Sequence, residues 1–163
     1  MAKISALLKR VEAIAGGDLS EHFSRVEFAC HCCGQLRLDH GLIDALERLH
    51  ELADRSIVVH DGFRCPGHNK AVGGAANSEH TRGLAADISV HGLTLQQFFE
   101  LALQIPAFFH GGIGVYDSGF LHVDISPHRA RWAKIGGGYV ALEKLVTIPV
   151  TLLANVRGGA QPA

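Results

Sequence analysis

The sequence has no apolar run long enough to cross a bilayer as a helix, which argues against stable membrane insertion. It also lacks an excess of positive charge, since 15 Lys and Arg stand against 16 Asp and Glu for a net charge of −1. Binding to nucleic acid phosphates depends on such an excess, so no nucleic acid partner is expected. Internal repeats are absent as well, and the sequence leaves the oligomeric state unknown.

The N-terminus lacks the continuous apolar core of a secretory signal peptide. Residues 1–20 instead carry apolar side chains at helical spacing, which predicts a short amphipathic helix that ends at Gly16-Gly17. The apolar positions are Ile4, Leu7, Leu8, Val11 and Ile14. We therefore expect synthesis in the cytoplasm without a signal peptide. Action on a target outside the cytoplasm would then require another route of delivery.

The chain has 163 residues, the length of one ordinary domain, and its core needs no disulfide to fold. The composition, 47% hydrophobic and 19% charged, is typical of soluble globular proteins. We divide the chain into an N-terminal helix over 1–20, a main domain over 21–135 and an apolar extension over 136–163. Pro149 argues against one continuous helix in the extension, which we expect to pack on the domain or to meet a partner.

Helical and strand patterns are mixed along the main domain. A helix is expected at 41–54 from apolar residues at helical spacing, and another at 94–105, where Thr94 and Gln97 form a capping box. Strands are expected at 57–60, 84–90, 113–116 and 120–125. Residues 61–83, rich in Gly, Pro, Asn and Ser, predict a long loop with one helical turn. The mixture predicts an α+β fold with an antiparallel sheet.

His80 and Asp87 lie seven residues apart in a segment where Gly83 favours a loop running into a strand. From such a loop and strand, the two side chains can converge on one point. Imidazole and carboxylate are both good zinc ligands. Judged by spacing alone, a solvated loop histidine and a turn aspartate are the simpler interpretation.

His122 and Asp124 share one face of the predicted strand at 120–125, because residues two apart in a strand point the same way. Leu121 and Val123 point to the opposite face. Ionisable groups on a strand otherwise suited to burial are costly unless they are paired or bound to a metal. The alternative is a His–Asp hydrogen bond that faces solvent.

Arg64 directly follows the predicted strand at 57–60 and would lie at the mouth of a loop. A guanidinium in that position can hold a carboxylate through two parallel hydrogen bonds. Without further context, a surface arginine is the simpler interpretation.

Taken together, these segments resemble the D-Ala-D-Ala carboxypeptidase group of zinc peptidases, the M15 family. The matching pieces lie in the family's order over roughly residues 22–133. They are Gly62-Phe-Arg-Cys-Pro66, Asn69–Gly74, Ser78-x-His-x-x-Gly-x-Ala-x-Asp87, Gly111-Gly-Ile-Gly-Val-Tyr116, His122-Val-Asp124 and Ala130-Arg-Trp132. The motif from Ser78 to Asp87 is specific, and the ordered set is more specific still.

The resemblance implies a small antiparallel sheet flanked by helices, as in hedgehog signalling domains. It implies a zinc ion (Zn2+) held by His80 and Asp87, and hydrolysis of peptide bonds next to D-amino acids in peptidoglycan. Members act as carboxypeptidases or endopeptidases, and several are phage endolysins, which wait in the cytoplasm for a membrane pore. Arg64 matches the arginine that steadies the substrate's carbonyl or terminal carboxylate, and Ser78 is a candidate hydrogen-bond partner of the substrate.

The third zinc ligand is open between His122 and Asp124. Some relatives carry His-x-His here with the second histidine on zinc, so matching by position favours Asp124. Two histidines and one carboxylate are a common hydrolytic ligand set, which favours His122. We predict His122 as the ligand and Asp124 as a general base or as a group that orients a ligand. Asp61 is a second departure, since relatives commonly carry a small hydroxyl residue at that position.

Two functions of other classes are also compatible with the sequence. The same fold and zinc site could bind peptidoglycan or a protein without cutting it. The chain could also be a structural component of a phage tail, with residues 139–163 as an assembly contact. Arg64 and a polar residue beside the third ligand favour an enzyme. Carboxypeptidase and endopeptidase are not distinguished, because the two share the metal motif and differ in the loops around the cleft.

The four cysteines are Cys30, Cys32, Cys33 and Cys65. Synthesis in a reducing compartment favours free, buried thiols. A Cys30–Cys65 disulfide is one alternative. A second, structural zinc site is another, disfavoured because Cys-x-Cys-Cys is tighter than the usual zinc-knuckle spacing. A contact of Cys65 with the 30–33 segment would hold the Arg64 loop against the residues before the 41–54 helix.

Overall fold

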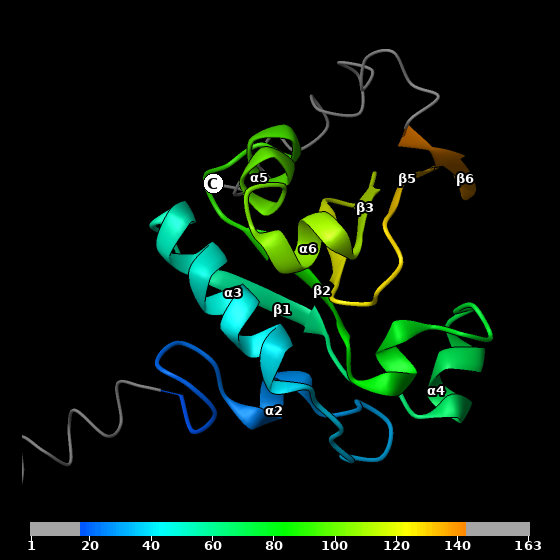
Figure 1. Cartoon of the computed structure of the whole chain (residues 1–163). Coiled ribbons are helices and arrows are strands. Elements are labelled where there is room, and N and C mark those ends of the chain that lie inside the picture. Colours follow the sequence, from blue (N-terminus) through cyan, green and yellow to red (C-terminus); the bar gives the residue numbers. More distant parts are fainter. Residues whose placement is uncertain (1–16, 143–163) are drawn as a thin grey trace, which may run out of the picture.

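Six strands form one sheet in the order β1-β2-β4-β3-β5-β6 in the computed structural model, which describes residues 17–142 (Figure 1). The strands are β1 (Ile57–Asp61), β2 (Ala85–Val90), β3 (Gly112–Tyr116), β4 (Phe120–Asp124), β5 (Ala130–Ile135) and β6 (Gly138–Ala141). The helices are α2 (Arg25–Phe28), α3 (His40–Ala53), α4 (Pro66–Ala71), α5 (Leu95–Ala102) and α6 (Pro106–His110), with a 3-10 turn η1 (Glu79–Arg82).

Neighbouring strands run antiparallel, with the exception of β3 and β5, which run parallel. The predicted α+β class is confirmed, and the four predicted strands correspond to β1 to β4. Strands β5 and β6 were not predicted. In β5, the charged residue Arg131 occupies a buried position, so the sequence does not alternate as a half-buried strand should.

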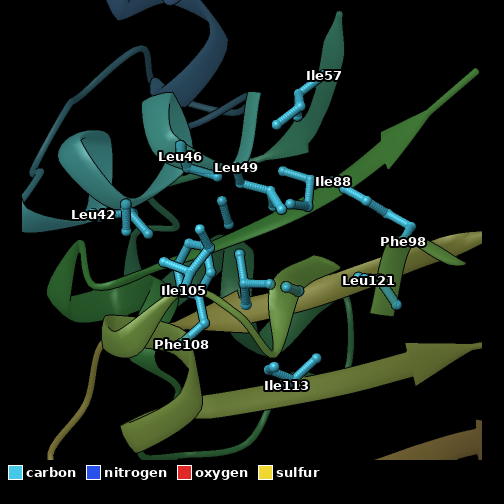
Figure 2. Close-up of a cluster of buried hydrophobic side chains, with 14 of the residues drawn as sticks. Leu42, Leu46, Leu49, Ile57, Ile88, Phe98, Ile105, Phe108, Ile113 and Leu121 are labelled. Carbon is cyan, nitrogen blue, oxygen red and sulfur yellow. The ribbon is translucent and has the colours of Figure 1, made fainter. Parts of the chain in front are cut away.

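Helices α3, α5 and α6 lie over one face of the sheet (Figure 1). Their apolar side chains meet those of the strands in a continuous core (Figure 2). Helix α3 contributes Leu42, Leu46 and Leu49, which are 0% exposed. Each such side chain contributes about 1.5–3 kcal/mol when it is removed from water. This helical layer leaves the opposite face of the central strands for other side chains.

The helices predicted at 41–54 and 94–105 are present with small differences in their bounds. Helix α3 begins after Asp39, whose carboxylate accepts a hydrogen bond from the Gly41 amide at 2.8 Å. Helix α5 has the predicted capping box at Thr94 but ends at Ala102, before the predicted limit of 105. Pro106 then begins α6, which was not predicted. Proline fits at the first position of a helix, because the backbone N–H that it lacks would have no partner within the helix there.

The predicted long loop over 61–83 contains both α4 and η1, more regular structure than the one turn expected. The proposed boundary at 135/136 falls inside the β5–β6 hairpin, and Leu142 is buried against the core. The expected helix at the N-terminus and the extension past residue 142 lie outside the described residues. Within residues 17–142, no helix is long and apolar enough to span a membrane.

Candidate metal centre

Three side chains from separate elements converge on the sheet face that the helices leave uncovered. His80 comes from η1, Asp87 from β2 and His122 from β4. The His80 Nε2 lies 3.2 Å from Asp87 Oδ1 and 3.1 Å from His122 Nδ1, and the latter two atoms are 3.0 Å apart. All three residues are buried.

The triangle of atoms has the size of one face of a zinc coordination tetrahedron. With metal–ligand bonds of about 2.0–2.1 Å, the ligand atoms of a tetrahedral site lie about 3.3 Å apart. Two imidazoles and one carboxylate are also the donors that zinc accepts in hydrolytic sites. The three side chains therefore fit a zinc ion, and all three line the cleft.

The far nitrogen of each histidine is engaged by the protein. The Nδ1–H of His80 donates to the Gly62 carbonyl at 2.7 Å. The Nε2 of His122 lies 3.3 Å from Asp124 Oδ2. A carbonyl or carboxylate behind an imidazole fixes its tautomer and aims the other nitrogen. His80 thus offers Nε2 and His122 offers Nδ1 to the same point.

Asp124 is itself held in place by backbone amides. Its Oδ1 accepts hydrogen bonds from the amides of Gly112 at 3.0 Å and Ser126 at 2.9 Å. A side chain at position 112 would not fit, since a Cβ there would lie 2.0 Å from Asp124 Oδ2. Asp124 therefore faces the ring of His122 from the side opposite Nδ1.

Arg64 contacts the metal centre through Asp87. Its Nη2 donates to Asp87 Oδ2, while Oδ1 of the same carboxylate faces the two histidines. Its Nε donates to Asp61 Oδ2 at 2.7 Å. The other oxygen, Asp61 Oδ1, is buried and has no hydrogen-bond partner among residues 17–142. Arg64 thus stands between two aspartates and also lines the cleft.

Opposite charges and hydrogen bonds outweigh the effect of burial on the pKa of Asp87, His122 and Asp124. Burial would raise the pKa of Asp87, but hydrogen bonds from His122 and His80 lower it well below the usual aspartate range. Burial would lower the pKa of His122, but Asp124 and Asp87 raise it to about 9. Burial would raise the pKa of Asp124, but His122 and Ser126 lower it to about 2. Both carboxylates are therefore charged at neutral pH.

The centre lies at the bottom of a cleft of about 590 Å³, a size suited to a small ligand or a short peptide segment. Trp132 of β5 lies beside the metal centre, with its ring centroid 5.2 Å from that of His122. Gly114 of β3 makes room for this indole, because a Cβ there would lie 2.4 Å from Trp132 Cε2. Ser78, the candidate substrate contact, also lines the cleft.

Aromatic rings and a lysine form another part of the cleft lining. Tyr116 stacks on Phe120 with ring centroids 4.4 Å apart. The Nζ of Lys134 lies 5.8 Å from the Tyr116 ring centroid and 5.3 Å from that of Tyr139. Burial raises the pKa of Tyr116 to about 12, so its hydroxyl keeps its proton at neutral pH. This wall offers apolar surface together with one positive charge.

Comparison with known proteins bears on this arrangement. A family model described as Peptidase M15 matches residues 21–124, more than half of the chain. The chain belongs to the M15 peptidase family. The match includes the three candidate ligands and ends at Asp124, so the part of the cleft lined by Ser126 to Tyr139 lies beyond it.

Curated relatives carry one shared name. The chain is 34% identical over 100 residues to Peptidoglycan L,D-endopeptidase MepK from Escherichia coli strain K12, E. coli O157:H7 and Shigella flexneri. Each alignment covers 56% of this chain and 53% of the relative. The chain thus spans about half the length of the curated relatives it matches.

The structure places every site residue expected from the sequence at or beside this M15 centre. Sequence reasoning gave no role to Gly62, Gly112, Gly114 or Trp132, which position the others. Gly62, Gly112, Gly114 and Trp132 all fall inside the motifs that carry the M15 resemblance. The signal was therefore present, but its meaning depends on which strands become neighbours.

Proposed function

We propose that the chain is a zinc-dependent peptidase that cuts peptide bonds next to D-amino acids in peptidoglycan, acting as an endopeptidase. The observation that carries the proposal is the convergence of His80 Nε2, Asp87 Oδ1 and His122 Nδ1 in a cleft of an M15 chain. The name of the curated relatives supports peptidoglycan as the substrate and an internal bond as the target.

In this proposal, His80, Asp87 and His122 hold the zinc ion. A zinc ion so bound lowers the pKa of water toward about 7 and polarises a carbonyl group. Each of these side chains is oriented by a partner in the chain. Arg64 holds Asp87, the Gly62 carbonyl holds His80, and Asp124 holds His122. Each ligand thus has a partner that fixes its orientation before substrate arrives.

Asp124 is assigned the orienting role in preference to that of general base. Its two oxygens already face three donors, namely the Gly112 amide, the Ser126 amide and His122. It also lies behind the imidazole of His122, away from the nitrogen offered to the metal. A base must reach the proton that it removes, within about 2.6–3.2 Å or through one water.

Arg64 is assigned two roles, to orient the metal ligand Asp87 and to bind the substrate. Its Nη2 and Nε are held by Asp87 and Asp61, and the side chain lines the cleft. A guanidinium fixed in this way can present its remaining N–H groups to a peptide carbonyl or a carboxylate. Lys134 in the aromatic wall supplies a second positive charge for an acidic stem peptide.

The test is digestion of purified peptidoglycan by the full chain with zinc, followed by mass analysis of the released fragments. An endopeptidase converts cross-linked or internal peptides into two peptide fragments. A carboxypeptidase releases only a terminal D-amino acid. A strong chelator should stop the reaction, and added zinc should restore it. The variant His80→Ala serves as the inactive control.

Each other outcome points to a different function. Release of terminal D-amino acids alone would replace the endopeptidase assignment with a carboxypeptidase. Sedimentation with peptidoglycan and no cleavage by zinc-loaded protein would indicate a binding module. Full activity of chelator-treated, metal-free protein would contradict the zinc-dependent mechanism.

A further inference from the structure

We propose that Cys30, Cys32, Cys33 and Cys65 form a second metal site, in which four thiolates hold a structural zinc ion. The site lies outside the peptidase cleft and does not depend on the proposed function. Three of its cysteines are in the loop after α2, and the fourth immediately precedes α4.

The four sulfur atoms surround a space of the size that one zinc ion occupies. Their Sγ atoms all lie within 4.8 Å of one another. Cys32 Sγ is 3.6 Å from Cys30 Sγ and 3.4 Å from Cys65 Sγ. With Zn–S bonds of about 2.3 Å, the sulfurs of a tetrahedral site lie about 3.8 Å apart. The observed spacing is that of a ligand set, although no pair is bonded.

A disulfide is a poorer explanation of the same cluster. A disulfide needs a sulfur–sulfur distance of about 2.05 Å, and all four cysteines are free in the structure. Any one disulfide would also leave two more thiols at the same point. The expectation of buried free thiols is wrong for Cys32 and Cys33, which are exposed, while Cys30 is buried. A cluster of four free thiols, two of them exposed, would be prone to oxidation without a metal.

Backbone amides point at two of the sulfurs. The Cys65 amide lies 3.3 Å from Cys30 Sγ, and the His68 amide lies 3.4 Å from Cys65 Sγ. Amide donors stabilise the thiolate form, which is the form that binds a metal.

The loop geometry answers the objection that Cys-x-Cys-Cys is too tight for zinc. The amides of Cys33 and Gly34 both donate to the Cys30 carbonyl, at 3.3 and 2.8 Å. Gly34 has a φ of +68°, a conformation that favours glycine. The chain therefore makes a tight turn over residues 30–34, which brings the Sγ atoms of Cys30, Cys32 and Cys33 close together.

The position of the site gives it a structural role for the peptidase centre. Cys65 directly follows Arg64, whose amide donates to the His80 carbonyl at 3.2 Å. The preceding residue, Phe63, donates its amide to the Phe28 carbonyl at 2.8 Å. A zinc ion bound by Cys65 and the 30–33 loop would anchor the chain just after Arg64, while the Phe63 hydrogen bond holds it just before.

The experiment counts metal in full-length protein purified with a thiol reductant and without added chelator. Wild type is expected to hold two zinc ions per chain. Cys33→Ser and Cys32→Ser, at exposed positions, should each hold one, and so should His80→Ala. His31→Ala is the matched control in the same loop, because His31 is exposed and not among the four ligands, and it should keep both ions.

Cobalt substitution identifies which site is filled. Tetrahedral thiolate–cobalt charge-transfer absorption should be present in wild type and in His80→Ala, and lost in Cys33→Ser. Any folded variant that keeps all four cysteines should show this absorption once cobalt is added. One zinc per wild-type chain together with four titratable thiols would overturn the proposal. A disulfide in the freshly purified protein, or iron in place of zinc, would overturn it as well.

Discussion

His122 and Asp124 lie on the same face of β4, with His122 Nε2 and Asp124 Oδ2 3.3 Å apart. Because the opposite nitrogen, Nδ1, faces Asp87 and His80, the proton on Nε2 decides whether His122 can bind a metal. Asp124, which is not itself one of the three candidate ligands, would therefore influence the metal affinity of the centre through His122.

Asp124→Asn is expected to weaken zinc binding at the peptidase centre by about 10- to 100-fold. Two backbone amides require the amide oxygen at the Oδ1 position, which leaves the NH2 group facing His122 Nε2. His122 would then carry its proton on Nδ1, where zinc should bind. Zinc affinity measured by competition with a chelator tests this. Asp117→Asn, elsewhere in the cleft, is the control. Unchanged affinity with lost turnover would instead indicate that Asp124 is a general base.

Zinc affinity at this centre is expected to fall as the pH falls. Burial lowers the pKa of His122, but Asp124 and Asp87 raise it above the ordinary 6.5, to about 9. The metal-free ring is therefore protonated at pH 7, and zinc must displace a proton. The dissociation constant should increase about tenfold for each pH unit below about 9. NMR titration of the metal-free chain measures the pKa directly, and a value below 7 would contradict the prediction.

Arg64→Lys is expected to reduce turnover at least tenfold and to weaken zinc binding, although the charge is kept. Lysine cannot donate to Asp61 and Asp87 at once from the planar fork that Arg64 uses. Steady-state kinetics and zinc affinity should be measured together. Arg82→Lys is the control, since Arg82 pairs with Glu79 at 2.9 Å on an exposed site. Normal kinetics for Arg64→Lys would leave Arg64 without the proposed role.

Gly114→Ala is expected to destabilise the fold by about 1–3 kcal/mol, because the new Cβ would collide with the Trp132 indole. Trp132 is the single tryptophan of the chain, so its fluorescence reports the displacement directly. A red-shifted emission and a lower midpoint of denaturation are expected. Gly138→Ala is the control, since its Cβ would meet its nearest atom at 3.6 Å. Unchanged fluorescence and stability would contradict the packing described.

The three candidate ligands could be singled out from the sequence because their motifs are local. The residues of β2 and β4 alternate between core and cleft, so Asp87 and His122 point away from the helices once the strands pair. The pairing brings Asp87 directly opposite His122. His80 could be singled out as well, because it belongs to the same Ser78–Asp87 motif as Asp87.

The surroundings of the ligands could not be predicted in the same way. The parallel pairing of β3 with β5 places Trp132 opposite Gly114, and the sequence of neither strand indicates that register. The buried Arg131 also makes β5 difficult to recognise as a strand from the sequence. Its Nη1 and Nη2 donate to carbonyls at the end of α6, including Gly111 and Phe109, at 2.7 Å each. A charge buried for this reason resembles a surface residue when only the sequence is considered.

The hairpin of β5 and β6 has a consequence for how members of this family could diverge. The candidate metal ligands all precede residue 125, whereas Trp132, Lys134 and Tyr139 line the cleft from a later, contiguous segment. Selection, or a protein engineer, could therefore replace Lys134 and Tyr139 and alter the preferred peptide while Trp132 and the candidate metal ligands stay in place.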